Sequence, residues 1–191
     1  MYQHFFKRLL DIILALIGII VCLIPLIIVS IILLFVNHGH VFFLQKRYTK
    51  NRKIFRIIKF RTLKLDTCND LVGENIDLSA NYTKVGRFLR KTAIDEIPQL
   101  FNILLGQMSF VGPRPASINY TALDEERSKY HLYDIKAGLT GYSQIVDKQT
   151  GITLENRIRL DLKYLNNLSF KTDVYLFFKT IKVMLGKKHD C

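Results

Sequence analysis

Tryptophan is absent from this sequence of 191 residues, and cysteine and proline are scarce, with three and four copies. The cysteines, Cys22, Cys68 and Cys191, lie far apart and form no CxxC pair. This spacing excludes a disulfide framework and the usual zinc-binding pattern, and it fits a protein of the reducing cytoplasm. Because no linker rich in proline, glycine or serine divides the chain, we expect one compact unit behind any membrane segment.

Acidic residues are also few. The chain has 16 Asp and Glu against 28 Lys and Arg, a formal net charge of +12, while 49% of its residues are hydrophobic. A basic surface combined with high hydrophobicity favours an anionic membrane surface or phosphorylated ligands as partners. Nucleic acid is the competing explanation for the charge. A nucleic-acid-binding domain has no need of a long leading apolar segment, so we expect no nucleic-acid partner.

Residues 9–36 form that segment, interrupted mainly by Asp11, Gly18, Pro25 and Ser30. A run of about 28 residues, rising roughly 1.5 Å per residue, is long enough to traverse a hydrocarbon core of about 30 Å. A signal peptide would have a shorter apolar region and a small-residue cleavage site. We therefore expect the segment to remain in the mature protein and to insert in a membrane.

Length alone favours a helix that spans the membrane, but the flanking charges favour a re-entrant one. Lys7 and Arg8 precede the segment, and several cations in 46–53 follow it, so the positive-inside rule places both ends in the cytoplasm. Pro25 removes a backbone donor and can bend the helix back to its side of entry. We favour a re-entrant helix over residues 1–38, with a kinked spanning helix as the alternative, followed by a cytoplasmic domain over 39–191.

The pattern after residue 38 predicts a helix-rich α/β fold. Two β-prone runs, 41–44 and 54–60, flank a basic turn and indicate a hairpin, and the polar stretch 66–83 indicates a flexible loop. Near the end, apolar residues recur at helical spacing between lysines, which predicts an amphipathic helix: Val174, Phe177, Phe178, Ile181, Met184 and Leu185. It either lies at the membrane interface or packs on the domain core.

The stretch 87–102 contains the most informative residues, Asp95 and Glu96. Proline is tolerated in the first turn of a helix, so Pro98 predicts a helix beginning close to Asp95 and ending at Gly106. Its predicted apolar face consists of Ile97, Leu100, Phe101, Leu104 and Leu105.

Carboxylates at a helix N-terminus remain ionised, and phosphate can dock there as well. Arg87, Arg90 and Lys91 lie just upstream and can neutralise phosphates that the carboxylates would repel. A carboxylate beside a cluster of cations suits phosphoryl transfer. The competing interpretation is an ordinary N-cap followed by a solvated basic face.

Two further motifs present cations. In residues 112–115, two prolines restrict the backbone around Arg114, which predicts a rigid phosphate clamp or simply a stiff turn. Lys59 and Arg61 fall on one face of a predicted strand, with Phe60 on the other, and can meet a diphosphate or lipid headgroups. The glycines of 138–142 predict a tight loop beside an aromatic ring, a weak signal for a uracil site.

Together these stretches resemble the bacterial sugar transferase family, the small monotopic phosphoglycosyl transferases, over nearly the whole chain. The resemblance rests on IDEIPQLFNILLGQMSFVGPRP at 94–115, KFRT at 59–62, GLTGYSQ at 138–144 and LDLKY at 160–164. It implies a re-entrant helix broken at a Ser-Pro pair, an Asp-Glu dyad with Mg²⁺, and a covalent phosphosugar intermediate. Carried over, Asp95 is the nucleophile, Glu96 its partner, and both are metal ligands.

The resemblance also implies a reaction: transfer of a sugar-1-phosphate from a UDP-sugar to polyprenyl (undecaprenyl) phosphate, with release of UMP. It would initiate surface glycan synthesis at the cytoplasmic face of the bacterial inner membrane, with membrane lipid and downstream glycosyltransferases as further partners. The implied phosphate-binding residues are Lys59, Arg61, Arg90, Arg114 and Lys148.

The chain departs from the family pattern at several positions. Gln107 replaces an aspartate, Lys136-Ala137-Gly138 stands for Arg-Pro-Gly, and Val146-Asp147-Lys148 stands for Asn-Gly-Arg. Ile24 replaces the serine before Pro25, which leaves the break to proline alone, and Lys148 replaces an arginine, which keeps the charge but loses the bidentate fork. Two other functions stay open. One is a non-catalytic basic membrane anchor or assembly partner, and the other is a glycosyltransferase that moves the sugar without its phosphate and releases UDP.

Overall fold

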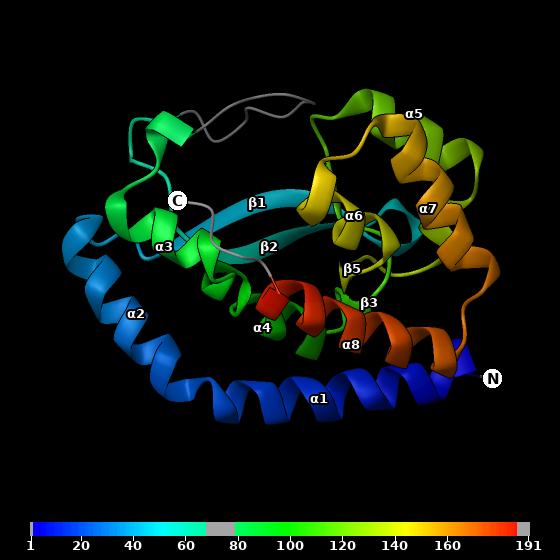
Figure 1. The fold of residues 1–191 in the computed structure, drawn as a ribbon, viewed down its shortest axis with the longest axis horizontal. Coiled ribbons are helices and arrows are strands. Elements are labelled where there is room, and N and C mark those ends of the chain that lie inside the picture. Colours follow the sequence, from blue (N-terminus) through cyan, green and yellow to red (C-terminus); the bar gives the residue numbers. More distant parts are fainter. Residues whose placement is uncertain (1, 68–78, 187–191) are drawn as a thin grey trace.

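The computed structural model describes residues 2–67 and 79–186, and within these the side chain of Lys148 is among those not described. The loop predicted over 66–83 therefore falls mainly outside the described residues. The helix-rich α/β fold is confirmed (Figure 1). Its regular elements are α1 (Lys7–Val21), α2 (Leu23–Val36), β1 (Phe42–Tyr48), β2 (Ile54–Phe60), α3 (Lys84–Lys91), α4 (Gln99–Leu104), β3 (Ser109–Val111), β4 (Ala116–Ser117), α5 (Thr121–Lys129), β5 (Gly138–Thr140), α6 (Tyr142–Thr150), α7 (Leu154–Asn166) and α8 (Phe170–Gly186).

The apolar segment folds as two helices, α1 and α2, bent by 61° at Cys22. In the described chain no one helix is long and apolar enough to cross a membrane, whereas the bent pair together has the length and composition to do so. The bend lies one turn before Pro25, rather than at Pro25 itself as predicted. Pro25 has no N–H to donate to Val21, and the helix opens where that hydrogen bond is missing.

Helix α1 docks on α4 through small residues and one arginine. Ala15 is fully buried, and a Cβ added to Gly18 would lie 3.1 Å from Leu100 of α4. Arg8 donates from its two terminal nitrogens to the carbonyls of Ile103 (2.6 Å) and Leu104 (2.8 Å) at the end of α4. Gly106 N–H also donates to the Ile103 carbonyl (2.9 Å), so Arg8 adds to the C-terminal cap of α4 and ties the apolar segment to it.

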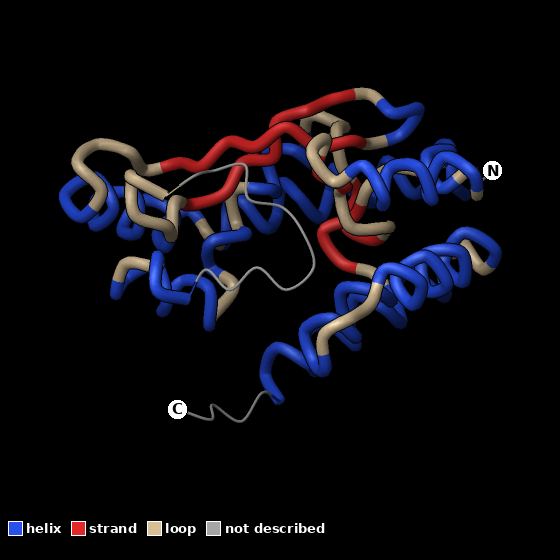
Figure 2. The backbone as a smooth tube through the Cα atoms, turned by 90° about the horizontal axis from the view of Figure 1, so that it is seen from above, coloured by secondary structure: helices blue, strands red, loops and turns tan. Residues whose placement is uncertain are grey.

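The predicted hairpin is confirmed, with β1 continuing through the basic residues to Tyr48. β1 and β2 pair antiparallel from Phe42–Phe60 to Tyr48–Ile54, and β4 joins the other edge of β1. β3 and β5 form a separate parallel pair. Figure 2 shows the hairpin as a long ribbon along one side of the molecule. Asn102 of α4 extends the β2 edge, accepting from Ile58 N–H (2.9 Å) and donating to Arg56 O (2.8 Å).

Of the two alternatives for α8, the structure shows packing on the domain core, and a position at the membrane interface stays a prediction. Leu176 is fully buried in a core cluster with Val111 and Tyr164. Phe177 and Val183 are half-buried, and five other apolar side chains of α8 are exposed: Phe170 56%, Val174 37%, Phe178 63%, Ile181 39% and Met184 41%. Asp173 ties α8 to the start of the chain, accepting from Lys7 (2.6 Å), Tyr2 (2.6 Å) and Tyr164 (2.7 Å). One side of α8 therefore packs on the domain while the other remains apolar and uncovered.

Candidate active site

Asp95 and Glu96 lie in a single 3₁₀ turn, Ile94–Glu96, between α3 and α4. The chain reverses at Ala93, whose φ is +56°, and the α-helix begins only at Gln99 with Pro98 as its N-cap. The predicted helix start close to Asp95 is therefore correct only for this short turn. Because α4 has only six residues, its dipole is a weak source of stabilisation for the carboxylates. The predicted stop at Gly106 is confirmed, with φ +79° just after α4.

A half-buried lysine, Lys59, replaces the helix terminus as the partner of the carboxylates. Asp95 is only 6% exposed. Lys59 donates from Nζ to Glu96 Oε1 at 2.8 Å, with both side chains about one-fifth exposed (20% and 21%). Burial raises the pKa of Asp95, and nearby Glu96 raises it further, while Lys59 and Arg90 lower it. Asp95 is thus a poorly hydrated carboxyl held among cations, a setting that favours nucleophilic chemistry.

Strand β2 presents the cations of KFRT as predicted. Lys59 lies opposite Phe43 in the ladder, and the guanidinium of Arg61 lies 5.7 Å from the Phe43 ring, so both face the same side. Phe60 faces the other side and is 1% exposed in the core under α2. Nε and one terminal nitrogen of Arg61 are buried without a hydrogen-bond partner among the described residues. Such donors are costly to bury and suit an incoming phosphate.

Helix α3 brings Arg90 to the dyad. Its guanidinium lies 4.7 Å from the Tyr82 ring centroid and is near enough to Asp95 to lower the pKa of that carboxyl. α3 is positioned by a close backbone approach, since a Cβ at Gly86 would lie 2.0 Å from the carbonyl oxygen of Thr62. The helix that carries Arg90 is therefore fixed directly against the chain that follows Lys59 and Arg61.

Arg114 lies in the connection from β3 to β4. Its carbonyl oxygen accepts a hydrogen bond from Arg127 at 2.6 Å, and Arg127 pairs with Asp161 at 2.7 Å, with both side chains 2% exposed. A backbone anchored on a fully buried ion pair has little freedom. The backbone at Arg114 is thus restrained, as predicted. The buried Arg127–Asp161 pair restrains it together with the two prolines.

Two cations that sequence reasoning missed lie near Arg114, namely Arg47 on β1 and Arg157 on α7. The positive charge of Arg114 lowers the pKa of Arg47, Arg157 and Lys59, although burial is the largest cause in each case. The pKa of Arg47 falls to about 9, so it stays cationic at neutral pH. The Nε atoms of Arg47 and Arg157 are buried without a hydrogen-bond partner among the described residues. In the sequence, only the position of Arg47 on the inward face of the predicted hairpin pointed to such a role. The sequence did not show which residues Arg47 would approach.

Other predicted features have structural explanations or lie outside the described residues. A Cβ at Gly138 would lie 2.1 Å from Gly112 N, so these glycines allow the two segments to pack backbone to backbone. Tyr142 is the aromatic ring of the loop that the sequence suggested as a uracil site, and Lys163 lies 4.9 Å from the centroid of this ring. The side chain of Lys148 is not described, so its predicted role stays a prediction.

The carboxylate pair fits a magnesium ion better than a transition metal. In residues 2–67 and 79–186 no three His, Cys, Asp or Glu side chains gather as a metal cage. Mg²⁺ commonly rests on one or two carboxylates and completes its shell with substrate phosphates and water. Asp95 and Glu96 provide such oxygen ligands beside cations that attract phosphate, so the residues present fit the ion.

The buried carboxyl of Asp95 thus lies beside Lys59 and Arg90, in a domain joined to a bent apolar helix pair. The chain belongs to the bacterial sugar transferase family, whose model matches residues 2–187.

Among its curated relatives, the UDP-N-acetylgalactosamine-undecaprenyl-phosphate N-acetylgalactosaminephosphotransferase of Aeromonas hydrophila is 32% identical over 95% of this chain and 44% of the relative. The UDP-glucose:undecaprenyl-phosphate glucose-1-phosphate transferase of Klebsiella pneumoniae is 35% identical over 92% and 39%. The exopolysaccharide production protein PSS of Rhizobium leguminosarum bv. phaseoli is 34% identical over 92% of both chains. The chain therefore spans less than half of the first two relatives and nearly all of the third.

Proposed function

We propose that this chain transfers a sugar-1-phosphate from a UDP-sugar to undecaprenyl phosphate, releasing UMP, at the start of surface polysaccharide synthesis. The names of the Aeromonas and Klebsiella relatives state such transfers for those proteins. The observation that carries the proposal here is the burial of Asp95 (6% exposed) beside the Lys59–Glu96 ion pair. A carboxylate so placed can attack a phosphorus, and the cations around it can hold the phosphates.

The proposed reaction has two displacements. An Asp95 carboxylate oxygen attacks the phosphorus that bears the sugar, a new O–P bond forms, and the bond from that phosphorus to the bridging oxygen breaks, so that UMP leaves. A phosphate oxygen of the lipid acceptor then attacks the same phosphorus. The bond to Asp95 breaks, the carboxylate is regenerated, and the product is a polyprenyl-diphospho-sugar.

The basic residues around the dyad serve both steps. Lys59 and Arg90 lie beside the point of attack, while Arg114, Arg47 and Arg157 form a second group that can bind the diphosphate. Arg61, with its unsatisfied buried nitrogens, and Lys148 complete the proposed phosphate-binding set. Asp95 and Glu96 would hold Mg²⁺, which when bound neutralises diphosphate charge and improves UMP as a leaving group.

We further propose that residues 1–38 form a re-entrant membrane unit and that 39–191 form the cytoplasmic catalytic domain, at the bacterial inner membrane. Support comes from the 61° bend and from apolar side chains exposed along both helices, such as Ile17 (53%), Ile20 (72%) and Ile24 (70%). Lys7 and Arg8 before the segment and the basic hairpin after it favour the same side for both ends.

The covalent step can be tested by mass spectrometry. Enzyme given UDP-sugar and Mg²⁺ without lipid acceptor should gain one phosphosugar per chain, on the peptide that contains Asp95, and release one equivalent of UMP. Asp95→Asn should abolish both signals, while the exposed control Asp134→Asn should retain them. UMP that appears only with acceptor, and no adduct under rapid quench, would favour direct transfer. UDP in place of UMP would indicate a glycosyltransferase, and no nucleotide release at all would indicate an assembly partner.

A further inference from the structure

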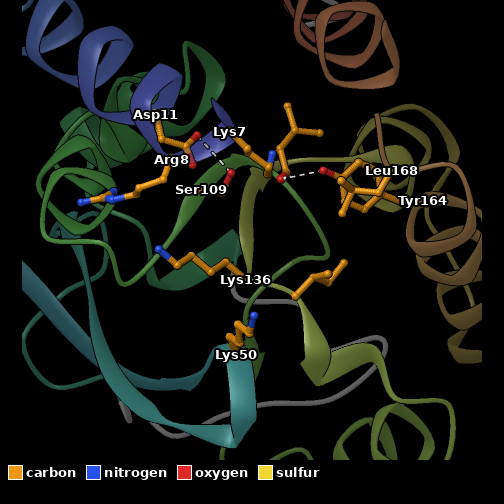
Figure 3. A pocket seen from close by; sticks show the side chains of 10 residues that line it. Lys7, Arg8, Asp11, Lys50, Ser109, Lys136, Tyr164 and Leu168 are labelled. Atoms are coloured by element: carbon orange, nitrogen blue, oxygen red, sulfur yellow. Dashed lines mark hydrogen bonds between the residues drawn. The ribbon is translucent and has the colours of Figure 1, made fainter. Parts of the chain in front are cut away.

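A second basic cavity of about 130 Å³ lies away from the dyad, beneath the start of α1. Figure 3 shows it, with Lys7, Arg8 and Asp11 of α1 on one side and Lys50 and Lys136 from two other segments on the other. Lys50 belongs to the turn of the hairpin, and Lys136 precedes β5. Four cations and one carboxylate thus line the same cavity.

Most of the polar groups in this cavity are already paired. Lys7 pairs with Asp173, and Arg8 caps α4. Asp11 accepts from the Ser109 hydroxyl and the Phe110 N–H, both at 3.0 Å.

Two lysines remain. Within the described residues, neither Lys50 nor Lys136 makes an ion pair or a side-chain hydrogen bond. Burial lowers the pKa of Lys136, and the neighbouring Arg8, Lys50 and Lys7 lower it further, while Asp11 raises it. Like charges gathered in a partly buried space are unfavourable unless an anion joins them.

The cavity is separate from the site of phosphoryl transfer. Lys50 lies in the hairpin turn, whereas Lys59 lies five positions beyond Ile54, where β2 begins. At roughly 3.3 Å per residue, the strand alone separates the two ends by on the order of 17 Å. A phosphate held by Lys50 and Lys136 is thus too far away to react with Asp95.

An apolar groove of about 260 Å³ adjoins the basic cavity and shares Lys7, Asp11 and Val111 with it. It runs between α1 and α8 and is lined largely by Leu10, Leu14, Phe110, Val174, Phe177 and Phe178. Leu14 and Phe178 are 39% and 63% exposed, so the groove opens onto the uncovered apolar surface of both helices. A polar head and an apolar chain can therefore occupy adjoining spaces.

We propose that these two cavities bind one anionic glycerophospholipid of the bilayer, with its phosphate between Lys50 and Lys136 and an acyl chain in the groove between α1 and α8. The proposal rests on the proposed membrane placement of α1 and α2. Charge complementarity selects an anionic head, and the continuity of the groove with the exposed faces of α1 and α8 selects a bilayer lipid over a soluble phosphate. The bound lipid fastens α8 to α1 and makes membrane attachment sensitive to lipid charge.

Vesicle binding tests the headgroup site. The full chain is mixed with vesicles of phosphatidylcholine, with and without phosphatidylglycerol, and its partition is measured by flotation. Lys50→Gln/Lys136→Gln is compared with Lys46→Gln/Lys53→Gln, which removes two exposed lysines from the same hairpin. The cavity variant should lose roughly tenfold or more of the preference for phosphatidylglycerol, and the control much less. Equal losses in the two variants would show that diffuse charge alone is responsible and would overturn the proposal.

Binding to neutral vesicles separates this proposal from the membrane placement on which it rests. All variants should bind phosphatidylcholine vesicles equally if α1 and α2 insert, and failure of the wild type there would refute the placement itself. UMP release by the same samples tests the proposed reaction independently.

Native mass spectrometry identifies the occupant. Protein extracted from mixed vesicles should retain one phosphatidylglycerol, and Val174→Trp, which fills the groove, should reduce that retention. Displacement of the retained lipid by polyprenyl phosphate at equal concentration would assign the cavity to the acceptor instead and overturn the proposal. Displacement by inorganic phosphate would mean that the groove plays no part, and would overturn it as well.

Discussion

Arg127 and Asp161 are the most deeply buried charges in the described chain, and they lie behind the site rather than in it. Each is further hydrogen-bonded, Arg127 to the Arg114 carbonyl and Asp161 to the Ser143 hydroxyl at 2.6 Å. A buried pair with these additional partners holds the backbone at Arg114 in one position. Its value lies in geometry more than in net stability.

Removing one member of this pair should be strongly destabilising. Arg127→Met leaves Asp161 charged and buried, which we expect to lower the free energy of unfolding by about 3–5 kcal/mol. Denaturant unfolding in detergent measures the change, with the exposed Arg159→Met as control. The double variant Arg127→Met/Asp161→Leu should recover much of the stability but not the activity, because the Arg114 carbonyl remains without its donor. A stability loss for Arg127→Met no larger than that of the control would contradict the structural role of the pair.

The two predicted phosphate clamps, Arg90 and Arg114, can be tested against Arg87, which lies on the same helix as Arg90. Arg90→Ala and Arg114→Ala each remove a cation from the proposed phosphate site, and we expect kcat to fall by about 10²–10³. Arg87 is exposed on α3 and, unlike Arg90, does not shift the pKa of Asp95, so Arg87→Ala should stay near wild type. UMP release under saturating UDP-sugar gives the comparison. Equal activity in all three variants would make these arginines surface features.

At the scale of the elements, short loops and close approaches position the site. Gly86 lets α3 lie directly on the backbone of Thr62, and Gly112 does the same for the segment after β3 against β5. Asn102 fastens α4 to the edge of β2. Each element that carries a site residue is thus fixed to another by its backbone.

Gly86→Ala tests this arrangement. A methyl group 2.0 Å from the Thr62 oxygen cannot be accommodated, so α3 must move and take Arg90 with it. We expect a loss of about 1–3 kcal/mol in stability and a larger fractional loss of activity than in a variant of equal stability elsewhere. Gly186→Ala, where the new Cβ meets nothing within 4 Å, is the matched control. A Gly86→Ala enzyme with wild-type melting temperature and turnover would refute this packing.

At the scale of the whole molecule, the proposed re-entrant topology places both ends of the bent pair on the cytoplasmic side of the membrane. In a cysteine-free background, Phe5→Cys and Lys53→Cys, both at exposed positions, should be labelled only by a reagent on the cytoplasmic side. Ile24→Cys, inside the proposed membrane unit, should resist labelling from either side. Labelling of Phe5→Cys from the periplasm would show that the segment spans.

Pro25→Ala extends the same assay to the cause of the bend. The new N–H can donate to Val21, which should straighten α1 and α2 and shift part of the population to a spanning topology. We therefore expect some periplasmic labelling of Phe5→Cys in this background. Unchanged labelling would mean that the packing of α1 on α4 and of α2 on Leu89 holds the bend without the proline.

Local sequence determined much of what the structure contains. The hairpin, the alternation of Lys59, Phe60 and Arg61, and the end of α4 at Gly106 follow from residue patterns acting over a few positions. The identity of the carboxylate pair also came from one contiguous stretch. These features depend on contacts between near neighbours in the chain, which is why the sequence was enough.

Only the tertiary structure decided what surrounds the carboxylates. Asp95 is buried because α3 and β2 pack against the turn that carries it, and Lys59 reaches Glu96 across 37 positions of sequence. Arg47 and Arg157 approach Arg114 because β4 pairs with β1 and α7 packs behind it. Burial and long-range electrostatics depend on which distant segments meet, and no local pattern encodes that meeting. The sequence by itself therefore named the candidate reacting residues, while the fold determined their hydration, their charge partners and the second basic cavity.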